Sequence, residues 1–155
     1  MKKRSLNKAE IKELNEKISF GFELPVKSRV EMVEDKLNII LVESQPVAFE
    51  YEGKVLPTLK TLQEKQMLKK ITVDMGAVKF VAGGADIMRP GIVAIEDGIA
   101  AGDGVVIVDQ NFGKMLAVGV ALFSSEEMKA MQKGKVIKNL HYVGDQIWNF
   151  GKEIG

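Results

Sequence analysis

One stretch, residues 73–92, most constrains what this chain can fold into, because it concentrates backbone freedom and positive charge together. It contains four of the 15 glycines and one of the four prolines, and a Lys and an Arg flank its glycine pair. Gly83 and Gly84 lack the Cβ that bars positive φ and close approach by another molecule, so their backbone N–H groups can face a ligand such as a phosphate. The alternative is an ordinary strand-to-helix turn, since glycine pairs mark turns in many folds.

The composition is that of a globular protein without an overall basic character. At 155 residues the chain is long enough for one domain or two small ones, and 46% hydrophobic residues can fill a core. Residues 1–72 hold 14 basic and 11 acidic side chains, a net charge of +3, whereas residues 73–155 hold 8 and 10, a net charge of −2. A nucleic-acid site in the second half must therefore be local, or be helped by the first half.

The missing residue types exclude several kinds of site. The chain has no cysteine and a single histidine, His141. This composition excludes disulfides and Cys/His zinc sites. The start, Met1–Arg4, leads into polar sequence rather than the apolar region of a signal peptide, and no apolar run approaches the roughly 18 residues that span a bilayer. We expect a soluble cytoplasmic protein with no metal, no cofactor and no membrane contact.

The first half has the pattern of a small α+β domain. Apolar spacing predicts an amphipathic helix over residues 5–18, with Ser5 or Asn7 as its cap. Short apolar runs predict strands over 30–33, 37–42 and 47–51, and Pro57 is expected to begin a short helix. The basic cluster at residues 2–4 is either a solvated start to the chain or a phosphate contact.

The second half reads as short strands separated by glycine turns. Strands are expected over 91–95, 105–108, 115–122, 136–137 and 147–150, the second and third forming a hairpin. Ser124 and Glu127 match a capping box for a short helix to Gln132, and no motif of a catalytic serine surrounds Ser124. This pattern indicates a compact, mostly β barrel.

The segments Gly76–Val81, Gly84–Met88 and Arg89–Ile92 together resemble the opening of a PUA domain, an RNA-binding module found in pseudouridine synthases and archaeosine transglycosylases. With Asn139–Tyr142 and Trp148, the string is more particularly similar to the translation-associated PUA proteins. In eukaryotes these pair with the density-regulated protein or lie within ligatin. Pro57-Thr58-Leu59 also matches an element that leads into the PUA domain of that family.

The resemblance, which runs from about residue 56 to residue 148, implies a fold and a domain organisation. The fold class is α+β, with a small N-terminal α/β-mixed domain in residues 1–72. A C-terminal PUA-type β-barrel, or pseudobarrel, with short helices follows in residues 73–155.

The resemblance also implies an RNA-facing groove beside the first helix of the barrel. Carried over onto this sequence, the candidate RNA contacts are Lys79, Gly83, Gly84, Ala85, Met88, Arg89, Pro90 and Gly91, to which we add His141. Lys79 and Arg89 would neutralise phosphates, and Ala85 and Met88 would give an apolar floor to a base or ribose. Trp148 is expected to be structural.

No acid/base pair, nucleophile or metal pattern is apparent, so we expect a non-enzymatic RNA-binding protein. By resemblance its ligand is a tRNA 3′ end or small-subunit ribosomal RNA, in translation initiation or recycling, with a separate partner carrying an initiation-factor-type domain. Two alternatives remain open. One is a protein-binding adaptor with a PUA-like barrel, and the other is an RNA-gripping accessory subunit of an RNA-modification enzyme.

Overall fold

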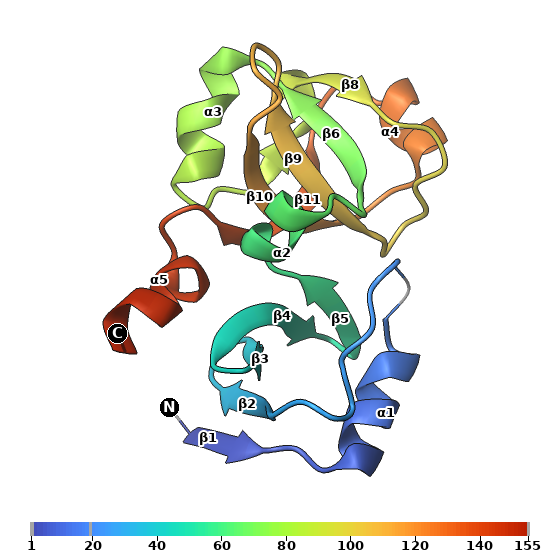
Figure 1. Cartoon of the computed structure of the whole chain (residues 1–155). Helices are drawn as coiled ribbons and strands as arrows, with labels where there is room; N and C mark the ends of the chain where they lie inside the picture. The colour runs from blue at the N-terminus through green and yellow to red at the C-terminus, as the bar shows by residue number, and fades with distance from the viewer. Residues whose placement is uncertain (1, 19, 155) are drawn as a thin grey trace. The chain divides into compact units, whose positions relative to one another are not determined.

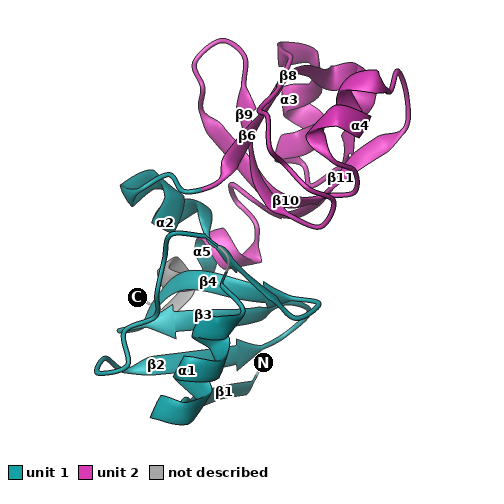
Figure 2. Ribbon diagram, turned by 90° about the vertical axis from the view of Figure 1, so that its right-hand side faces the viewer, with its two compact units in different colours: residues 1–67, 149–155 teal, residues 68–148 magenta. Residues whose placement is uncertain are grey.

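The computed structural model describes residues 2–18 and 20–154 and divides the chain into two compact units (Figure 2). Unit 1 comprises Met1–Met67 with Asn149–Gly155, and unit 2 comprises Leu68–Trp148. The sequence analysis put the domain boundary after Thr72. In the structure, that position lies within strand β6 (Lys69–Val73), which pairs with β8 and β9 of unit 2.

Unit 1 is an antiparallel sheet with helices. Its five strands follow one another in the order β1-β2-β3-β4-β5. They span Lys2–Ser5, Val30–Glu34, Asn38–Val42, Gln45–Tyr51 and Lys54–Pro57. Helix α1 (Lys8–Glu16) places Ile11 and Leu14 in a core with sheet residues such as Ile40 and Val55. The mixed character expected for the first half is confirmed.

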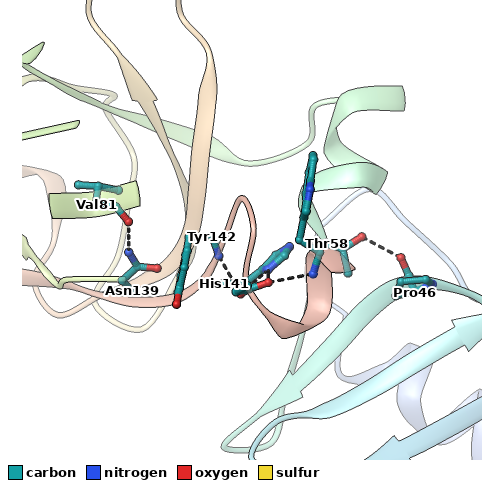
Figure 3. Close-up of polar contacts among 8 residues, drawn as sticks. Pro46, Thr58, Val81, Asn139, His141 and Tyr142 are labelled. Atoms are coloured by element: carbon teal, nitrogen blue, oxygen red, sulfur yellow. Dashed lines mark hydrogen bonds and ion pairs between the residues drawn. The ribbon is translucent and has the colours of Figure 1, made fainter. Parts of the chain in front are cut away.

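Local capping chemistry determines where the helices of unit 1 begin. Asn7 is the cap of α1, and it forms a reciprocal capping box with Glu10. Pro57, expected to start a helix, instead ends β5. Thr58 caps α2 (Leu59–Glu64), and its hydroxyl also donates to the Pro46 carbonyl at 3.1 Å (Figure 3).

Unit 2 is a six-stranded, nearly closed barrel-like sheet in the order β7-β11-β10-β9-β6-β8 (Figure 1). β6 and β9 are parallel, and the other neighbouring strands are antiparallel. Besides β6, the strands are β7 (Ile87–Met88), β8 (Ile92–Ile95), β9 (Gly104–Asp109), β10 (Met115–Ala121) and β11 (Lys135–Tyr142). The helical elements of this unit are α3 (Met75–Ala82), the 3₁₀ turn η1 (Arg89–Gly91) and α4 (Ser125–Ala130). The expected barrel with short helices is confirmed.

Two expectations for the second half were wrong. The run 147–150 belongs to helix α5 (Gln146–Ile154) rather than to a strand. Ile147 and Phe150, three residues apart, are both buried, which is helical spacing, but a four-residue apolar run cannot show this by periodicity alone. The closing strand is β11, which extends well beyond residues 136–137. No helix in the described residues is long and apolar enough to cross a membrane.

Strands β10 and β11 approach each other closely at Gly119 on β10, where their pairing shifts register. A Cβ at this position would collide with the Lys138 carbonyl oxygen and lie 2.8 Å from Cγ2 of Ile137. The two strands approach this closely only because glycine has no side chain.

Gly119→Ala should lower the free energy of unfolding by roughly 1–3 kcal/mol, the usual cost of overpacking a core. Urea denaturation followed by circular dichroism measures the change. The matched control is Gly76→Ala in α3, because a Cβ there would make an ordinary contact with Oδ1 of Asp74 at 3.4 Å. Equal stability of the two variants would contradict the close approach of β10 and β11.

Candidate nucleic-acid interface

Helix α3 is fixed at its first turn by Asp74. The Asp74 carboxylate accepts a hydrogen bond from the Ala77 N–H at 2.8 Å, and the Asp74 N–H donates to the Gly91 carbonyl at 2.9 Å. A Cβ on Gly91 would lie only 3.0 Å from the Cβ of Ala77. The glycine therefore lets η1 pack directly against α3.

The glycine pair ends α3. Gly84 has φ +94°, its N–H donates to the Val81 carbonyl at 3.0 Å, and the Ala85 N–H donates to the Phe80 carbonyl at 3.0 Å. These two bonds form a Schellman motif, and the Gly83 N–H also donates to helix carbonyls. The pair is thus a helix-to-strand turn whose N–H groups are used inside the protein. The interpretation of free donors for a phosphate was wrong.

Strand β11 holds the end of α3 in place. The side-chain amide of Asn139 donates to the carbonyl of Val81 at 3.1 Å (Figure 3) and to that of Ala85 at 3.0 Å. A Cβ on Gly84 would lie 2.8 Å from Cε1 of Tyr142, so the tyrosine ring packs directly over the glycine.

A groove of about 750 Å³ lies between α3, β7 and η1. Its lining is mostly apolar, and these apolar residues are Ala77, Phe80, Val81, Ala85, Ile87, Met88 and Pro90. Phe80 and Met88 are 60% and 50% exposed, so the groove presents an aromatic ring and a thioether to its contents. Such a surface suits a flat, weakly hydrated group.

Most charges at the groove are already compensated within the protein. Asp86 accepts the Asn139 N–H at 2.9 Å and pairs with Lys135 at 3.3 Å. Burial raises the pKa of the Asp86 carboxyl, but the Asn139 N–H and the nearby lysines outweigh burial and lower that pKa. Lys79 makes no ion pair with any described residue, and its Nζ lies 5.2 Å from the centroid of the Phe80 ring. Lys79 therefore lies beside the exposed aromatic ring, within cation–π distance of it, and is not neutralised by a carboxylate of the described residues.

The structure brings together four of the nine predicted contacts. Ala85, Met88, Pro90 and Gly91 all line the groove. Lys79, Gly83 and Gly84 lie on α3 and its terminal turn without lining the groove.

Arg89 has a different role from the expected one. Its Nε donates to the Met128 carbonyl at 2.6 Å and its Nη1 donates to the Ile92 carbonyl at 3.1 Å. Met128 lies in the last turn of α4, where a cation is favoured by the helix dipole. Arg89 therefore ties η1 to α4 and is absent from the groove lining.

His141 is not a surface residue. Its side chain is 1% exposed, and its Nδ1 lies 2.9 Å from Oδ2 of Asp145. Asp145 also accepts the N–H groups of Tyr142 and Trp148, both at 2.9 Å. In this structure His141 belongs to a buried pair, so its imidazole contacts Asp145 rather than the surface.

Phe80 and Asn139 are two important residues of this region to which the sequence analysis gave no role. The composition of α3 held a signal for Phe80, because the helix is apolar over most of its length and yet Val81 is its one buried side chain. For Asn139 no local signal exists, since its amide partner Val81 lies 58 residues away.

Comparison with known proteins agrees with this architecture. A PUA domain model matches residues 69–143, and a model described as a domain of unknown function (DUF1947) matches residues 2–65. The chain is 45% identical to an uncharacterized protein of Methanocaldococcus jannaschii, with 96% of each covered. It is 34% identical to Translation machinery-associated protein 20 of Saccharomyces cerevisiae, with 84% of this chain and 77% of that protein covered.

Two solved structures extend the comparison. A hypothetical protein of Pyrococcus horikoshii has a TM-score of 0.81 at 34% identity, and the match covers 97% of this chain and 99% of that one. An H/ACA ribonucleoprotein bound to a substrate RNA contains a chain with a TM-score of 0.50 at 29% identity, covering 62% of this chain and 29% of that one.

Unit 2 is a nearly closed barrel with a groove beside its first helix, and the PUA domain model matches almost all of it. These features define a PUA-domain protein, a class associated with RNA binding. Within that class, the chain belongs to the translation-associated family that includes Translation machinery-associated protein 20.

Arg89→Gln should lower the free energy of unfolding by roughly 1–3 kcal/mol, because the carbonyls of Met128 and Ile92 lose a charged donor. The matched control is Lys79→Gln, which removes an exposed cation and should change stability by less than about 0.5 kcal/mol. Urea denaturation measures both variants. A stable Arg89→Gln protein would show that the guanidinium is not a structural link.

The Asp145 carboxyl should make stability depend on acid. Burial raises its pKa, but the hydrogen bond and charge of His141 and the N–H groups of Trp148 and Tyr142 outweigh burial and lower that pKa below 3.8. A lowered folded-state pKa stabilises the protein above the unfolded value, and this contribution disappears as pH falls through the folded value. Thermal unfolding between about pH 6 and pH 2 should therefore show a steeper acid loss for the wild type than for Asp145→Asn. Parallel curves would contradict the role of Asp145.

Proposed function

We propose that this protein is a cytoplasmic, non-enzymatic RNA-binding protein of the translation machinery that holds an unpaired RNA end in the α3 groove. The ligand is the 3′ end of tRNA or an exposed segment of small-subunit ribosomal RNA, in initiation or recycling. The observation that carries this proposal is the exposed Phe80 ring at an apolar groove, with the Lys79 ammonium, which has no carboxylate partner among the described residues, beside it.

The chemistry of the groove favours unpaired nucleotides. A base that stacks on an aromatic side chain gains roughly 1–3 kcal/mol, and Phe80 offers such a ring. Met88 and Ala85 supply the apolar floor, and Lys79 lies close enough to the ring to neutralise the phosphate of the same nucleotide. Proteins read unstacked bases more readily than the deep major groove of A-form RNA, so a single-stranded end is the ligand that fits.

The charge of unit 2 supports a small phosphate footprint. Residues 68–148 contain nine basic and nine acidic side chains, so this unit is neutral. Each neutralised phosphate adds about 0.7 to the salt dependence of single-strand binding. A site built on one or two cations binds with a shallow salt dependence and draws most of its affinity from stacking.

We further propose that a separate protein with an initiation-factor-type domain works with this one. Support comes from the relatives, whose name associates them with the translation machinery.

A second candidate function is an RNA-gripping accessory subunit of an RNA-modification enzyme. The specific observation in its favour is the similarity of the barrel to a chain of an H/ACA ribonucleoprotein bound to substrate RNA. In that case the same groove would hold the substrate of a catalytic partner.

Binding of a fluorescent tRNA with an intact 3′ end should be tighter than binding of the same tRNA lacking its single-stranded 3′ nucleotides. Phe80→Ala should weaken binding to the intact tRNA roughly 5- to 150-fold, the effect of losing one base–aromatic stack. Phe80→Tyr is the control that keeps an aromatic ring. Fluorescence anisotropy at two salt concentrations gives the affinities and the salt dependence.

Two results would contradict the proposal. Equal affinity for both tRNAs would remove the 3′ end as the ligand. Full affinity in Phe80→Ala would remove the groove as the site, and an absence of RNA binding by the wild type would favour the adaptor function.

A further inference from the structure

The tip of the β9–β10 hairpin carries an aromatic side chain that the groove does not use. Phe112 is 84% exposed, the largest exposed fraction among the large apolar side chains of the described residues. An isolated aromatic ring that extends into water from a loop tip contributes nothing to the core. Core packing therefore does not explain why residue 112 is a phenylalanine.

The loop that presents Phe112 is well ordered by Asp109. The buried Asp109 carboxylate accepts the N–H of Phe112 at 2.6 Å and the N–H of Lys114 at 3.1 Å. The Asp109 N–H donates to the Lys114 carbonyl and the Gly113 N–H donates to the Asp109 carbonyl, both at 3.1 Å. These N–H groups, that of Phe112 above all, lower the pKa of the Asp109 carboxyl. These hydrogen bonds hold the backbone of the loop, so the point from which the Phe112 ring extends into solvent is preorganised.

The hairpin tip lies at the same end of unit 2 as the beginning of α3 (Figure 1). The Gln110 N–H donates to the Val73 carbonyl at 3.0 Å, and the next residue, Asp74, lines the groove. Phe112 follows Gln110 by two residues, so their Cα atoms are at most roughly 7 Å apart. A short run of nucleotides can therefore extend from the groove to the ring.

The side chains around Phe112 favour RNA over an apolar protein surface. Gln110 and Asn111 offer amide groups, and Lys114 makes no ion pair with any described residue. The only acidic side chain of the loop, Asp109, is buried in the hydrogen bonds described above. A protein-docking patch needs contiguous apolar area, and this loop has one apolar side chain. An aromatic ring beside a lysine and amides is a typical contact for an unpaired nucleotide.

We propose that Phe112 is a second stacking platform, which takes an unpaired base of the same RNA strand whose end occupies the α3 groove, while Lys114 neutralises an adjacent phosphate. This inference rests on the proposed RNA-binding function. The proposed binding site then contains two aromatic residues, Phe80 and Phe112. A short RNA would contact only one of them, whereas a longer RNA would contact both.

Length-dependent RNA binding tests the proposal. Labelled single-stranded RNAs of about 3 and about 12 nucleotides of mixed sequence are titrated with the wild type and with Phe112→Ala, Phe112→Tyr and Phe112→Leu. We expect Phe112→Ala to weaken binding of the longer RNA roughly 5- to 150-fold and to leave the shorter RNA nearly unchanged. Phe112→Tyr should retain affinity for the longer RNA, whereas Phe112→Leu, which is apolar but not planar, should not.

Charge gives an independent readout. Lys114→Gln should reduce the slope of log affinity against log salt for the longer RNA by about 0.7, the effect of one phosphate contact. The matched control is Lys133→Gln, an exposed lysine on a different loop, which should leave that slope unchanged.

Specific outcomes would overturn the inference. If Phe112→Ala binds both RNAs like the wild type while Phe80→Ala weakens both, the hairpin is not a contact and the proposed function stands. Full affinity in Phe112→Leu would show an apolar contact rather than base stacking. If the wild type binds neither these RNAs nor tRNA, the proposed function fails and this inference fails with it.

Discussion

The groove depends on how the last turn of α3 is closed onto β11. A Schellman motif at Gly83–Gly84 turns the chain sharply, the Tyr142 ring packs over Gly84, and the Asn139 amide takes up two carbonyls of the turn. These contacts place the α3 face that bears Phe80 opposite Met88, and so create the groove. A methyl group added at Gly84 would meet Cε1 of Tyr142 at 2.8 Å and would be strained by the positive φ of this residue. The geometry of the interface therefore derives from the packing of one helix end.

Several basic side chains make contacts within the protein. In unit 2, Arg89 and Lys135 are tied to backbone carbonyls or to a carboxylate, and in unit 1 Lys3, Arg4, Lys17 and Arg29 pair with glutamates. Part of the excess of basic residues in the first half is thus neutralised by ion pairs within the protein. The basic cluster at residues 2–4 lies in an edge strand, and its Lys3 and Arg4 pair with glutamates. An interface of this kind relies on shape and stacking for most of its affinity. This distribution of charge is consistent with the proposed preference for exposed, unpaired nucleotides.

Two kinds of ordered backbone support the exposed aromatic residues. Phe80 stands on a helix capped by Asp74, and Phe112 stands on a loop organised by Asp109. In both cases a carboxylate accepts hydrogen bonds from backbone N–H groups. These bonds stabilise the structure and partly neutralise the carboxylate charge that would otherwise repel a phosphate. This arrangement explains how a neutral unit with several acidic side chains remains compatible with RNA. It also means that the acidic total of the second half was a poor guide to its surface.

The sequence by itself determined the family, the mixed fold class and the Ser124 cap of α4, because these depend on short strings and near neighbours. Ser124 and Glu127 are three residues apart, and the string from Asp74 to Ile92 is contiguous. The sequence left Ser5 and Asn7 open as caps of α1 and misplaced the start of α2. Only the tertiary structure decided the roles of Arg89, Asn139 and His141. Arg89 donates to a carbonyl 39 residues away, Asn139 donates to a carbonyl of α3 that lies 58 residues earlier, and His141 is buried by the fold. Which of these polar side chains remain available to a ligand depends on contacts between distant segments, and the local sequence pattern holds no information about them.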